Sequence, residues 1–343
     1  MSVTAVADPL EDVTQRRLPY IDYGAHPAYG GMFPPDHKLA RTTVAALQPW
    51  IDEAKRAERE RAALFGYRRF APSEVSRELA TQGCCVRQLA PELMEPLHQS
   101  VQPLIGAIRE RLGEMRSTGQ PIGFKATQEM IGPDRHCEIW KLAERTLQQA
   151  GVVQASLDYF GAAAAKLKAA AVMVNPEGQD WCADLFPDAA VETPPTVGFH
   201  IDSSSYCTLK VVLYLDDVES DQGPFGLIPT SHLWEQGGRE RTRRRAFDRS
   251  PLVSRAPGQR RAFTSLPADM QLKAEFGGDM LAGAPETEAL LQSERVMTGP
   301  RGQLNLFDPE AIHRGGHVRR GQRQVMLLSV AARWPAPQRG APS

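Results

Sequence analysis

The chain has 343 residues, of which 42% are hydrophobic and 24% are charged, and its formal net charge is −1 at pH 7. This length allows one large domain or two small ones, and the near-neutral charge gives no indication of general nucleic-acid binding. Lys166 and Lys168 interrupt the longest apolar stretch, so no segment reaches the roughly 20 apolar residues of a membrane-spanning helix.

The cysteines and the first residues bear on cellular location. The chain has 5 cysteines, and an odd count at this length favours reduced thiols. No CxxC pair is present, so a cysteine-based zinc site is not expected. The N-terminus lacks the basic start and apolar core of a secretory signal. A cytoplasmic protein is therefore expected.

The first half of the chain has mainly helical patterns. Residues 1–38 are rich in Pro, Gly and Tyr, lack periodicity and are expected to form an irregular arm. A single domain is expected over 39–333, and its part 39–165 should be mainly helical. Helices are predicted over 39–64, directly after the candidate N-cap Ser73, over 91–115, and over 138–159 as one or two helices.

The second half changes to the pattern of a β domain. Its apolar segments are short and bounded by turn residues, which is typical of a sandwich or barrel. Residues 166–333 are therefore expected to form a β core with helices packed on one side, an α+β architecture, followed by a flexible tail at 334–343. Strands are predicted over 169–174, 208–215, 225–228, 303–307 and 325–332.

An arginine-rich insertion at 234–261 interrupts this β core. One interpretation is a solvated surface loop or helix. The other is a lid that meets an anionic substrate, because guanidinium groups bind carboxylates and phosphates well.

His200 and Asp202 form a His-x-Asp pair that could bind a metal ion. Residues i and i+2 of an extended segment project from the same face, so the two side chains can converge. An isolated His-x-Asp pair is common by chance, and His313 supplies the third ligand type much later in the chain. Two histidines and one carboxylate are the ligand set that non-haem Fe(II) oxygenases use.

Two cationic residues accompany these candidate ligands. Arg323 follows His313 by ten residues and opens an apolar run, where its planar guanidinium could anchor a carboxylate beside the metal. Lys210 lies in a strand whose residues 209, 211, 213 and 215 are all apolar, so it belongs to the opposite face. It is expected to face a cavity near the cosubstrate or substrate, or to be a lysine at the rim with its amine in water.

The segments GPFGLIPTSH (223–232) and GQLNLFDPEAIHRGG (302–316) carry a family resemblance. The chain resembles the phytanoyl-CoA dioxygenase-like branch of the Fe(II)/2-oxoglutarate oxygenases, which typically shows an IPGSH segment, a later FD…HRG segment and an Arg on the final strand. The resemblance is specific over about 196–333, faint over 74–195 and absent over 1–70.

The resemblance implies a double-stranded β-helix, the cupin-like jelly-roll, with the metal at its mouth. His200, Asp202 and His313 would bind Fe(II), and Arg323 would bind the C5 carboxylate of 2-oxoglutarate. With O2, such enzymes oxidise an unactivated C–H bond, commonly to an alcohol, and many act in secondary metabolism. Related halogenases have Gly or Ala at the acid position, so Asp202 favours hydroxylation or a related oxidation.

Three further polar residues lie near these motifs. The resemblance makes His232 structural, and Asp308 is expected to orient the turn before His313. His317 follows the Gly315-Gly316 turn and is expected to point toward substrate or solvent.

Three other functions remain open from the sequence. A zinc-dependent hydrolase could use the same His/Asp/His site to activate water, but it gives no role to Arg323. A non-catalytic cupin-like binding protein would not require the metal ligands. A structural or interaction protein would rely on the arginine-rich insertion and the N-terminal arm. The expected partner is a small molecule, with an anionic or carrier-linked one favoured; no nucleic-acid or membrane partner is expected, and the oligomeric state is not predicted.

Overall fold

The computed structural model describes residues 71–179, 202, 207–233 and 291–333. The chain divides into two compact units. All the helices and strands named below lie in the second unit, which consists of Arg68–Gln179, Ser204–Leu233 and Ser293–Ser343, whereas Asp202 belongs to the first. Four predicted segments lie outside the described residues, namely 1–38, 39–64, 234–261 and 334–343.

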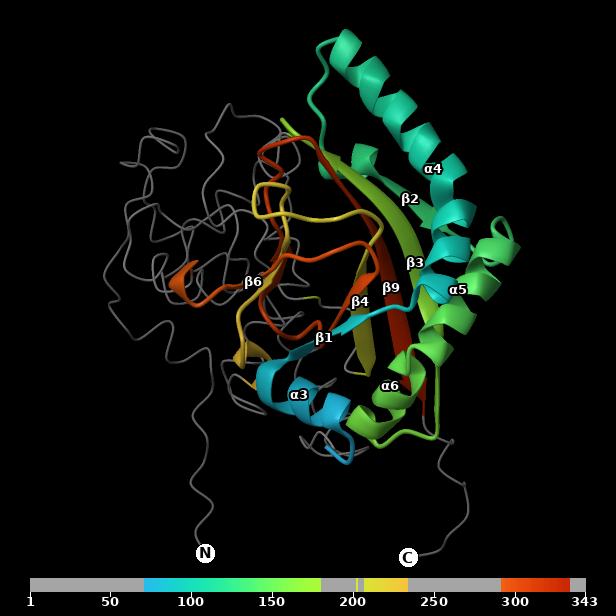
Figure 1. The fold of residues 1–343 in the computed structure, drawn as a ribbon, viewed down its shortest axis with the longest axis vertical. Coiled ribbons are helices and arrows are strands. Elements are labelled where there is room, and N and C mark those ends of the chain that lie inside the picture. The colour runs from blue at the N-terminus through green and yellow to red at the C-terminus, as the bar shows by residue number, and fades with distance from the viewer. Residues whose placement is uncertain (1–70, 180–201, 203–206, 234–290, 334–343) are drawn as a thin grey trace, which may run out of the picture. The chain divides into compact units, whose positions relative to one another are not determined.

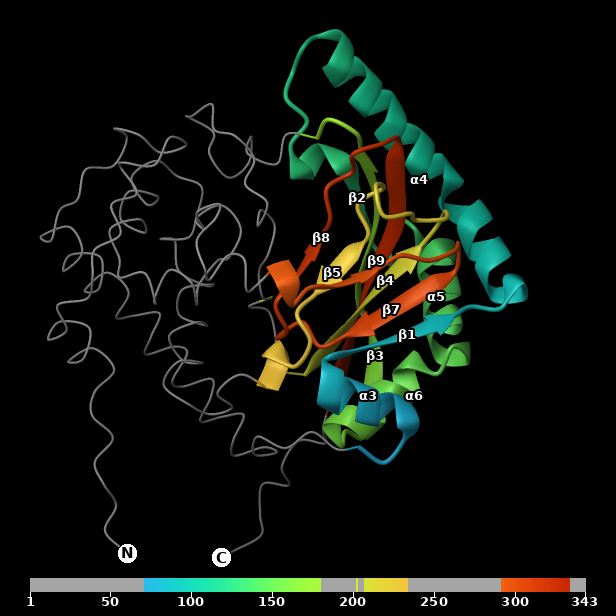
Figure 2. The same ribbon diagram turned by 60° about the vertical axis from the view of Figure 1, so that its left-hand side comes forward.

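The larger of two antiparallel sheets has 6 strands in the order β1-β7-β4-β9-β3-β2 (Figure 1; β7 is labelled in Figure 2). β9 follows every other described strand in the chain but lies in the middle of the sheet, between β4 and β3. A bulge between Leu167 and Ala169 interrupts the long β3–β9 pairing. The strands are β1 (Cys84–Gln88), β2 (Gln128–Ile131), β3 (Ala164–Pro176), β4 (Thr208–Tyr214), β7 (Gln303–Phe307) and β9 (Gln322–Arg333).

The smaller sheet has 3 strands in the order β6-β5-β8 (Figure 2). They are β5 (Phe225–Leu227), β6 (Arg295–Met297) and β8 (His313–Gly315). This sheet packs against one face of the larger sheet through an apolar cluster that joins Phe225 and Met297 to Val212, Tyr214 and Phe307. Both sheets together with separate helices give the α+β class that the sequence predicted.

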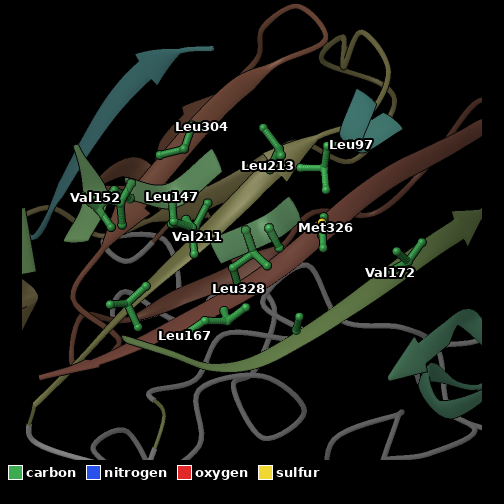
Figure 3. Packing of buried hydrophobic residues seen from close by; sticks show 14 of the residues in the cluster. Leu97, Leu147, Val152, Leu167, Val172, Val211, Leu213, Leu304, Met326 and Leu328 are labelled. Carbon is green, nitrogen blue, oxygen red and sulfur yellow. The ribbon is translucent and has the colours of Figure 1, made fainter. Parts of the chain in front are cut away.

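Helices cover the opposite face of the larger sheet. Their bounds are α3 (Glu74–Gln82), α4 (Pro91–Ser117), α5 (Cys137–Gln149) and α6 (Val152–Phe160), with short 3-10 turns η2 (Phe124–Thr127) and η3 (Ser231–Leu233). Leu97, Leu147 and Val152 from the helices meet Val211 and Leu328 from the strands in the main core (Figure 3). Within the described part of the chain, no helix is long and apolar enough to cross a membrane.

Local sequence explains these helices well. Ser73 is the N-cap of α3 as predicted, and its hydroxyl accepts a hydrogen bond from the backbone N–H of Ser76 at 3.2 Å. α4 buries residues at helical spacing on one face, so the amphipathic pattern predicted over 91–115 is confirmed. The buried residues of α4 are Met94, Leu97, Val101, Ile105, Ile108 and Leu112.

Strand β4 shows the predicted two-faced pattern. Leu209, Val211 and Leu213 are fully buried in the core beneath the helices. Val212 and Tyr214 belong to the cluster between the two sheets. Side chains alternate along a strand, so Lys210 belongs to the face that the smaller sheet covers.

Most predicted elements occur, but with different lengths. The segment 138–159, predicted as one or two helices, forms two, α5 and α6, and the strands predicted over 169–174 and 325–332 are the longer β3 and β9. The sequence did not predict β1, β2, β6 and β8, which have between 3 and 5 residues each. These strands mix polar and apolar residues without a clear pattern, unlike the equally short β5 and β7, so they carry no strand signal of their own.

Candidate active site

His313 begins β8 and is 5% exposed. Its Nδ1 lies 2.8 Å from the carbonyl oxygen of Ala311, which can only accept, so Nδ1 is the donor and Nε2 is the nitrogen that could bind a metal. The imidazole packs against Phe307 and Phe225, with ring centroids 4.7 and 6.0 Å away. A buried histidine held in this way is typical of a metal ligand, whose other nitrogen is bound by a carbonyl or carboxylate.

Arg323 lies near the start of β9 and is 4% exposed. Its Nε and Nη2 both donate to Oδ1 of Asn175, at 3.3 and 2.8 Å, and Nη1 donates to the carbonyl oxygen of Gly223. Asn175 is the direct partner of Arg323 across the β3–β9 ladder. The guanidinium is therefore held by neutral acceptors from two segments distant in sequence.

The charge of Arg323 is not compensated by any acid that the structure describes. Among the described residues, no Asp or Glu forms an ion pair with it. Burial lowers the pKa of Arg323 to about 10, and the nearby Tyr214 acts in the opposite direction. A buried cation with only neutral partners suits an anionic ligand, because the ligand would supply the missing charge.

Two glycine segments make room for this guanidinium. A Cβ on Gly315 would lie 2.6 Å from Nη2 of Arg323. A Cβ on Gly316 would lie 2.6 Å from the carbonyl oxygen of Pro224, and Gly223 has φ +70° and packs equally closely on Gly316. The glycines of the HRGG and GPF motifs thus serve the close approach of β8, the GPF turn and Arg323.

Tyr214 connects the larger sheet to the smaller one beside Arg323. Its hydroxyl accepts from the backbone N–H of Phe225 at 2.9 Å and donates to the carbonyl oxygen of Met297 at 2.5 Å. Burial raises the pKa of Tyr214, so the phenol stays neutral. Neither Tyr214 nor Asn175 can be recognised from the sequence, because the role of each arises from contacts with residues that are distant in the chain.

Lys210 is half-buried. It pairs with Phe307 on β7 and with Ser329 on β9, and the ring of Phe307 is the one that packs on His313. The predicted division of β4 into two faces is confirmed, because Leu209, Val211 and Leu213 belong to one apolar cluster and Val212 and Tyr214 to the other. A contact with cosubstrate or substrate stays a prediction.

The described residues do not include the complete set of predicted metal ligands. His200 lies outside them, and Asp202 is half-buried in the first compact unit. Among the residues that the structure describes, no three His, Cys, Asp or Glu side chains gather as a metal site. The three-ligand set therefore stays a prediction, and only His313 can be tested for fit.

The two other histidines near the motifs differ in their environments. His232 is 1% exposed, and its Nε2 lies 3.2 Å from the carbonyl oxygen of Ala80 at the end of α3, in agreement with the predicted structural role. His317 is half-buried. Burial, together with nearby arginines, lowers the pKa of His317 to about 4, so its ring is neutral near pH 7.

Comparisons with known structures give distant similarities. The chain is similar to EctD from S. alaskensis with 2-oxoglutarate and 5-hydroxyectoine, at 13% identity, a TM-score of 0.44 and coverage of 80% of this chain and 86% of that chain. It is similar to the carbocyclase SnoK from nogalamycin biosynthesis, at 14% identity, TM-score 0.40 and coverage of 79% and 89%. HygX from Streptomyces hygroscopicus, with nickel and 2-oxoglutarate bound, gives 14% identity, TM-score 0.40 and coverage of 79% and 95%.

Two further comparisons concern curated proteins and models of protein families. No curated protein matches the chain. The model of the family described as phytanoyl-CoA dioxygenase (PhyH) matches residues 125–325, which is more than half of the chain. This range contains His313, Arg323 and the glycine segments around them. The chain therefore belongs to the phytanoyl-CoA dioxygenase family, and it is an oxidoreductase of the Fe(II)- and 2-oxoglutarate-dependent class.

Proposed function

We propose that the protein uses Fe(II), 2-oxoglutarate and O2 to hydroxylate, or otherwise oxidise, an unactivated C–H bond of a small molecule. The observation that carries this proposal is the buried guanidinium of Arg323, which neutral groups hold and no described carboxylate neutralises. The C5 carboxylate of 2-oxoglutarate would fill this role through two parallel hydrogen bonds. A zinc hydrolase would leave Arg323 without a function.

The metal ligands in this proposal are His200, Asp202 and His313. Nitrogen and carboxylate donors suit Fe(II), and the buried imidazole of His313 is already oriented by Ala311. When bound together, iron, 2-oxoglutarate and O2 supply the oxidising chemistry. The chain itself positions these groups: Asn175 fixes the plane of Arg323, and Phe225 and Phe307 keep water from one side of His313.

We further propose that the two sheets are the halves of a double-stranded β-helix. Their antiparallel order, and the apolar cluster between them, support this assignment. One domain over 39–333 would then contain the helical part, the β core and the insertion at 234–261, with an arm at 1–38 and a tail at 334–343. A cytoplasmic location is also part of the proposal, and the free thiols of the described cysteines support it.

Three lysines, Lys166, Lys168 and Lys210, lie beside the second half of β9, whereas Arg323 lies near its start. These cations favour an anionic substrate, in free or carrier-linked form. Ser329 pairs with Lys210, and the next residue of the same face of β9, Ala331, pairs with Lys166. Lys166 and Lys210 therefore lie on the face toward the smaller sheet, with two small residues of β9 between them. Lys168 lies at the bulge between these rows. This arrangement would bind a carboxylate or phosphate of the substrate.

Succinate formation tests the reaction class. Purified protein with Fe(II), O2 and 2-oxoglutarate should release succinate when a panel of small-molecule acids is supplied. His313→Ala should abolish this turnover, and Arg323→Gln should raise the KM for 2-oxoglutarate by at least about tenfold, because charged hydrogen bonds contribute roughly 1.5–3 kcal/mol each. Absence of succinate with every substrate, together with unchanged metal binding in His313→Ala, would exclude the proposal.

The substrate class has its own test. A carboxylic acid that supports turnover is compared with its methyl ester in wild type and in Lys166→Gln/Lys210→Gln. The double variant should raise the KM of the acid and leave that of the ester unchanged. Lys141→Gln is the matched control, because Lys141 pairs with Glu138 on the exposed side of α5. An equal effect on acid and ester would contradict an anion-binding role.

A further inference from the structure

A buried hydrogen bond joins the helical layer to the loop that carries His313. The hydroxyl of Tyr159, on α6, donates to Oδ2 of Asp308 at 2.8 Å. Tyr159 is fully buried and Asp308 is 2% exposed. The two residues are 149 positions apart in the chain, so this contact exists only in the folded protein.

Asp308 organises the turn that leads to His313. Its Oδ1 accepts from the backbone N–H of Glu310 at 2.9 Å, and its carbonyl oxygen accepts from the N–H of Ala311 at 2.9 Å. Its own N–H donates to the carbonyl oxygen of Gly83 at 2.8 Å. The backbone of the turn is therefore fixed from both sides, and the predicted orienting role of Asp308 is confirmed.

The same turn sets the direction of the imidazole. The carbonyl oxygen of Ala311, whose N–H is held by Asp308, is the acceptor for Nδ1 of His313. A continuous path of hydrogen bonds thus runs from Tyr159 through Asp308 and Ala311 to His313. The Asp308 carboxylate holds the N–H of Glu310, so a small rotation of this carboxylate would shift Glu310 and with it the Ala311 carbonyl that follows. This shift would tilt the ring and displace Nε2 from its ligand direction.

We infer that Tyr159 and Asp308 are positioning residues for the metal site, acting through the backbone on His313. This inference rests on the proposed role of His313 as a metal ligand. α6 would then contribute to metal affinity although it lies beneath the larger sheet, on the face opposite the smaller sheet. The helix layer would be part of the metal centre and not only a cover for the core.

Metal affinity, measured apart from catalysis, tests the inference. The full-length, metal-free protein is titrated with Co(II), and the dissociation constant and the visible absorption bands are recorded. Tyr159→Phe removes one oxygen and leaves the ring in place. It should weaken Co(II) binding by about threefold to tenfold, below the 10–100-fold effect of losing a direct outer partner, and change the Co(II) bands.

A matched variant separates positioning from general stability. Val152→Ala also lies on α6 and truncates a side chain that is 2% exposed, so it destabilises the same helix without contacting Asp308. It should lower the melting temperature and leave Co(II) affinity unchanged. Asp308→Asn, which keeps an oxygen for Glu310, is the second variant if Tyr159→Phe does not fold, and it should weaken Co(II) binding in the same way.

The outcomes distinguish the inference from the function on which it rests. If Tyr159→Phe and Asp308→Asn bind Co(II) as tightly as wild type while His313→Ala does not, the positioning role is wrong and the metal site stands. If His313→Ala also binds Co(II) like wild type, the proposed metal site itself fails. Equal weakening in Val152→Ala and Tyr159→Phe would show a general stability effect and overturn the inference.

Discussion

Asn175 Oδ1 accepts hydrogen bonds from both Nε and Nη2 of Arg323, so a neutral amide from β3 fixes the plane of a buried cation on β9. A carboxylate in place of the amide would have the same shape but would neutralise the guanidinium. The uncharged partner leaves the positive charge available to a ligand. Replacing this amide with a carboxylate should therefore weaken cosubstrate binding without lowering the stability of the fold.

Asn175→Asp should raise the KM for 2-oxoglutarate by about tenfold or more, because the new carboxylate would compete with the cosubstrate for Arg323. The free energy of unfolding should not fall, since a paired buried cation replaces one with neutral partners. Asn175→Ala should also raise this KM, but should destabilise the protein by about 1–3 kcal/mol. Urea denaturation and steady-state kinetics measure both; a stable Asn175→Asp with normal KM would contradict the charge argument.

Gly315→Ala should weaken 2-oxoglutarate binding, because the added Cβ would lie 2.6 Å from Nη2 of Arg323 and would displace the guanidinium. Isothermal titration of the metal-loaded protein with 2-oxoglutarate measures the change. Gly113→Ala is the control, since a Cβ there meets nothing within 4 Å. Gly113 lies within the C-terminal part of α4, so the change to Ala should stabilise the fold by about 0.5–1 kcal/mol and leave binding unchanged. Equal affinities in the two variants would remove the explanation for Gly315.

The pKa of His317, which burial lowers to about 4, predicts a pH effect on stability. An unfolded histidine titrates near 6.5, so as pH falls from about 6.5 toward 4 the unfolded chain gains a proton that folded His317 does not. The free energy of unfolding should therefore fall across this window. His317→Gln should show a smaller decrease than wild type in urea titrations at several pH values. Parallel curves for the two proteins would show that His317 does not contribute.

Thr230 has φ 65° and is the only non-glycine residue with positive φ in the described part of the chain. The family pattern has glycine at this place. A left-handed conformation costs a β-branched residue about 1–2 kcal/mol, so Thr230→Gly should raise the free energy of unfolding by roughly 0.5–1 kcal/mol after the entropy cost of glycine. Thr81→Gly, in the exposed part of α3, should lower it by a few tenths. Thermal unfolding of both variants compares the signs, and destabilisation by Thr230→Gly would show that its side chain contributes to the turn.

The predictable parts of the fold were those with a regular pattern over many residues. The spacing of Leu97, Val101 and Ile105 identified α4, and the alternation of Leu209, Val211 and Leu213 identified both the strand and the face of Lys210. β8 has 3 residues, so its strand conformation depends on pairing with β5 and not on its own sequence. Its pairing partner β5 is distant in the sequence, and a local sequence pattern contains no information about such pairing.

The candidate site was predictable to the same extent. His313 and Arg323 can be selected from the sequence as candidate ligand-binding residues by residue type and spacing, since metal and carboxylate binding would require those groups. Asn175 and Tyr159 could not be recognised, because their roles arise from contacts with residues 148 and 149 positions away. Residues that bind ligands carry a chemical signal in the sequence, whereas residues that hold them in place acquire their role only through folding.

The central position of β9 has a consequence for protein synthesis. During translation, β9 emerges after all the other described strands, and until then β1, β7 and β4 have no sheet partner linking them to β3 and β2. The nascent chain therefore exposes the unpaired edges of β4 and β3, which favours aggregation or chaperone binding. The same strand carries Arg323, so its buried guanidinium enters the protein in the step that joins the two halves of the sheet.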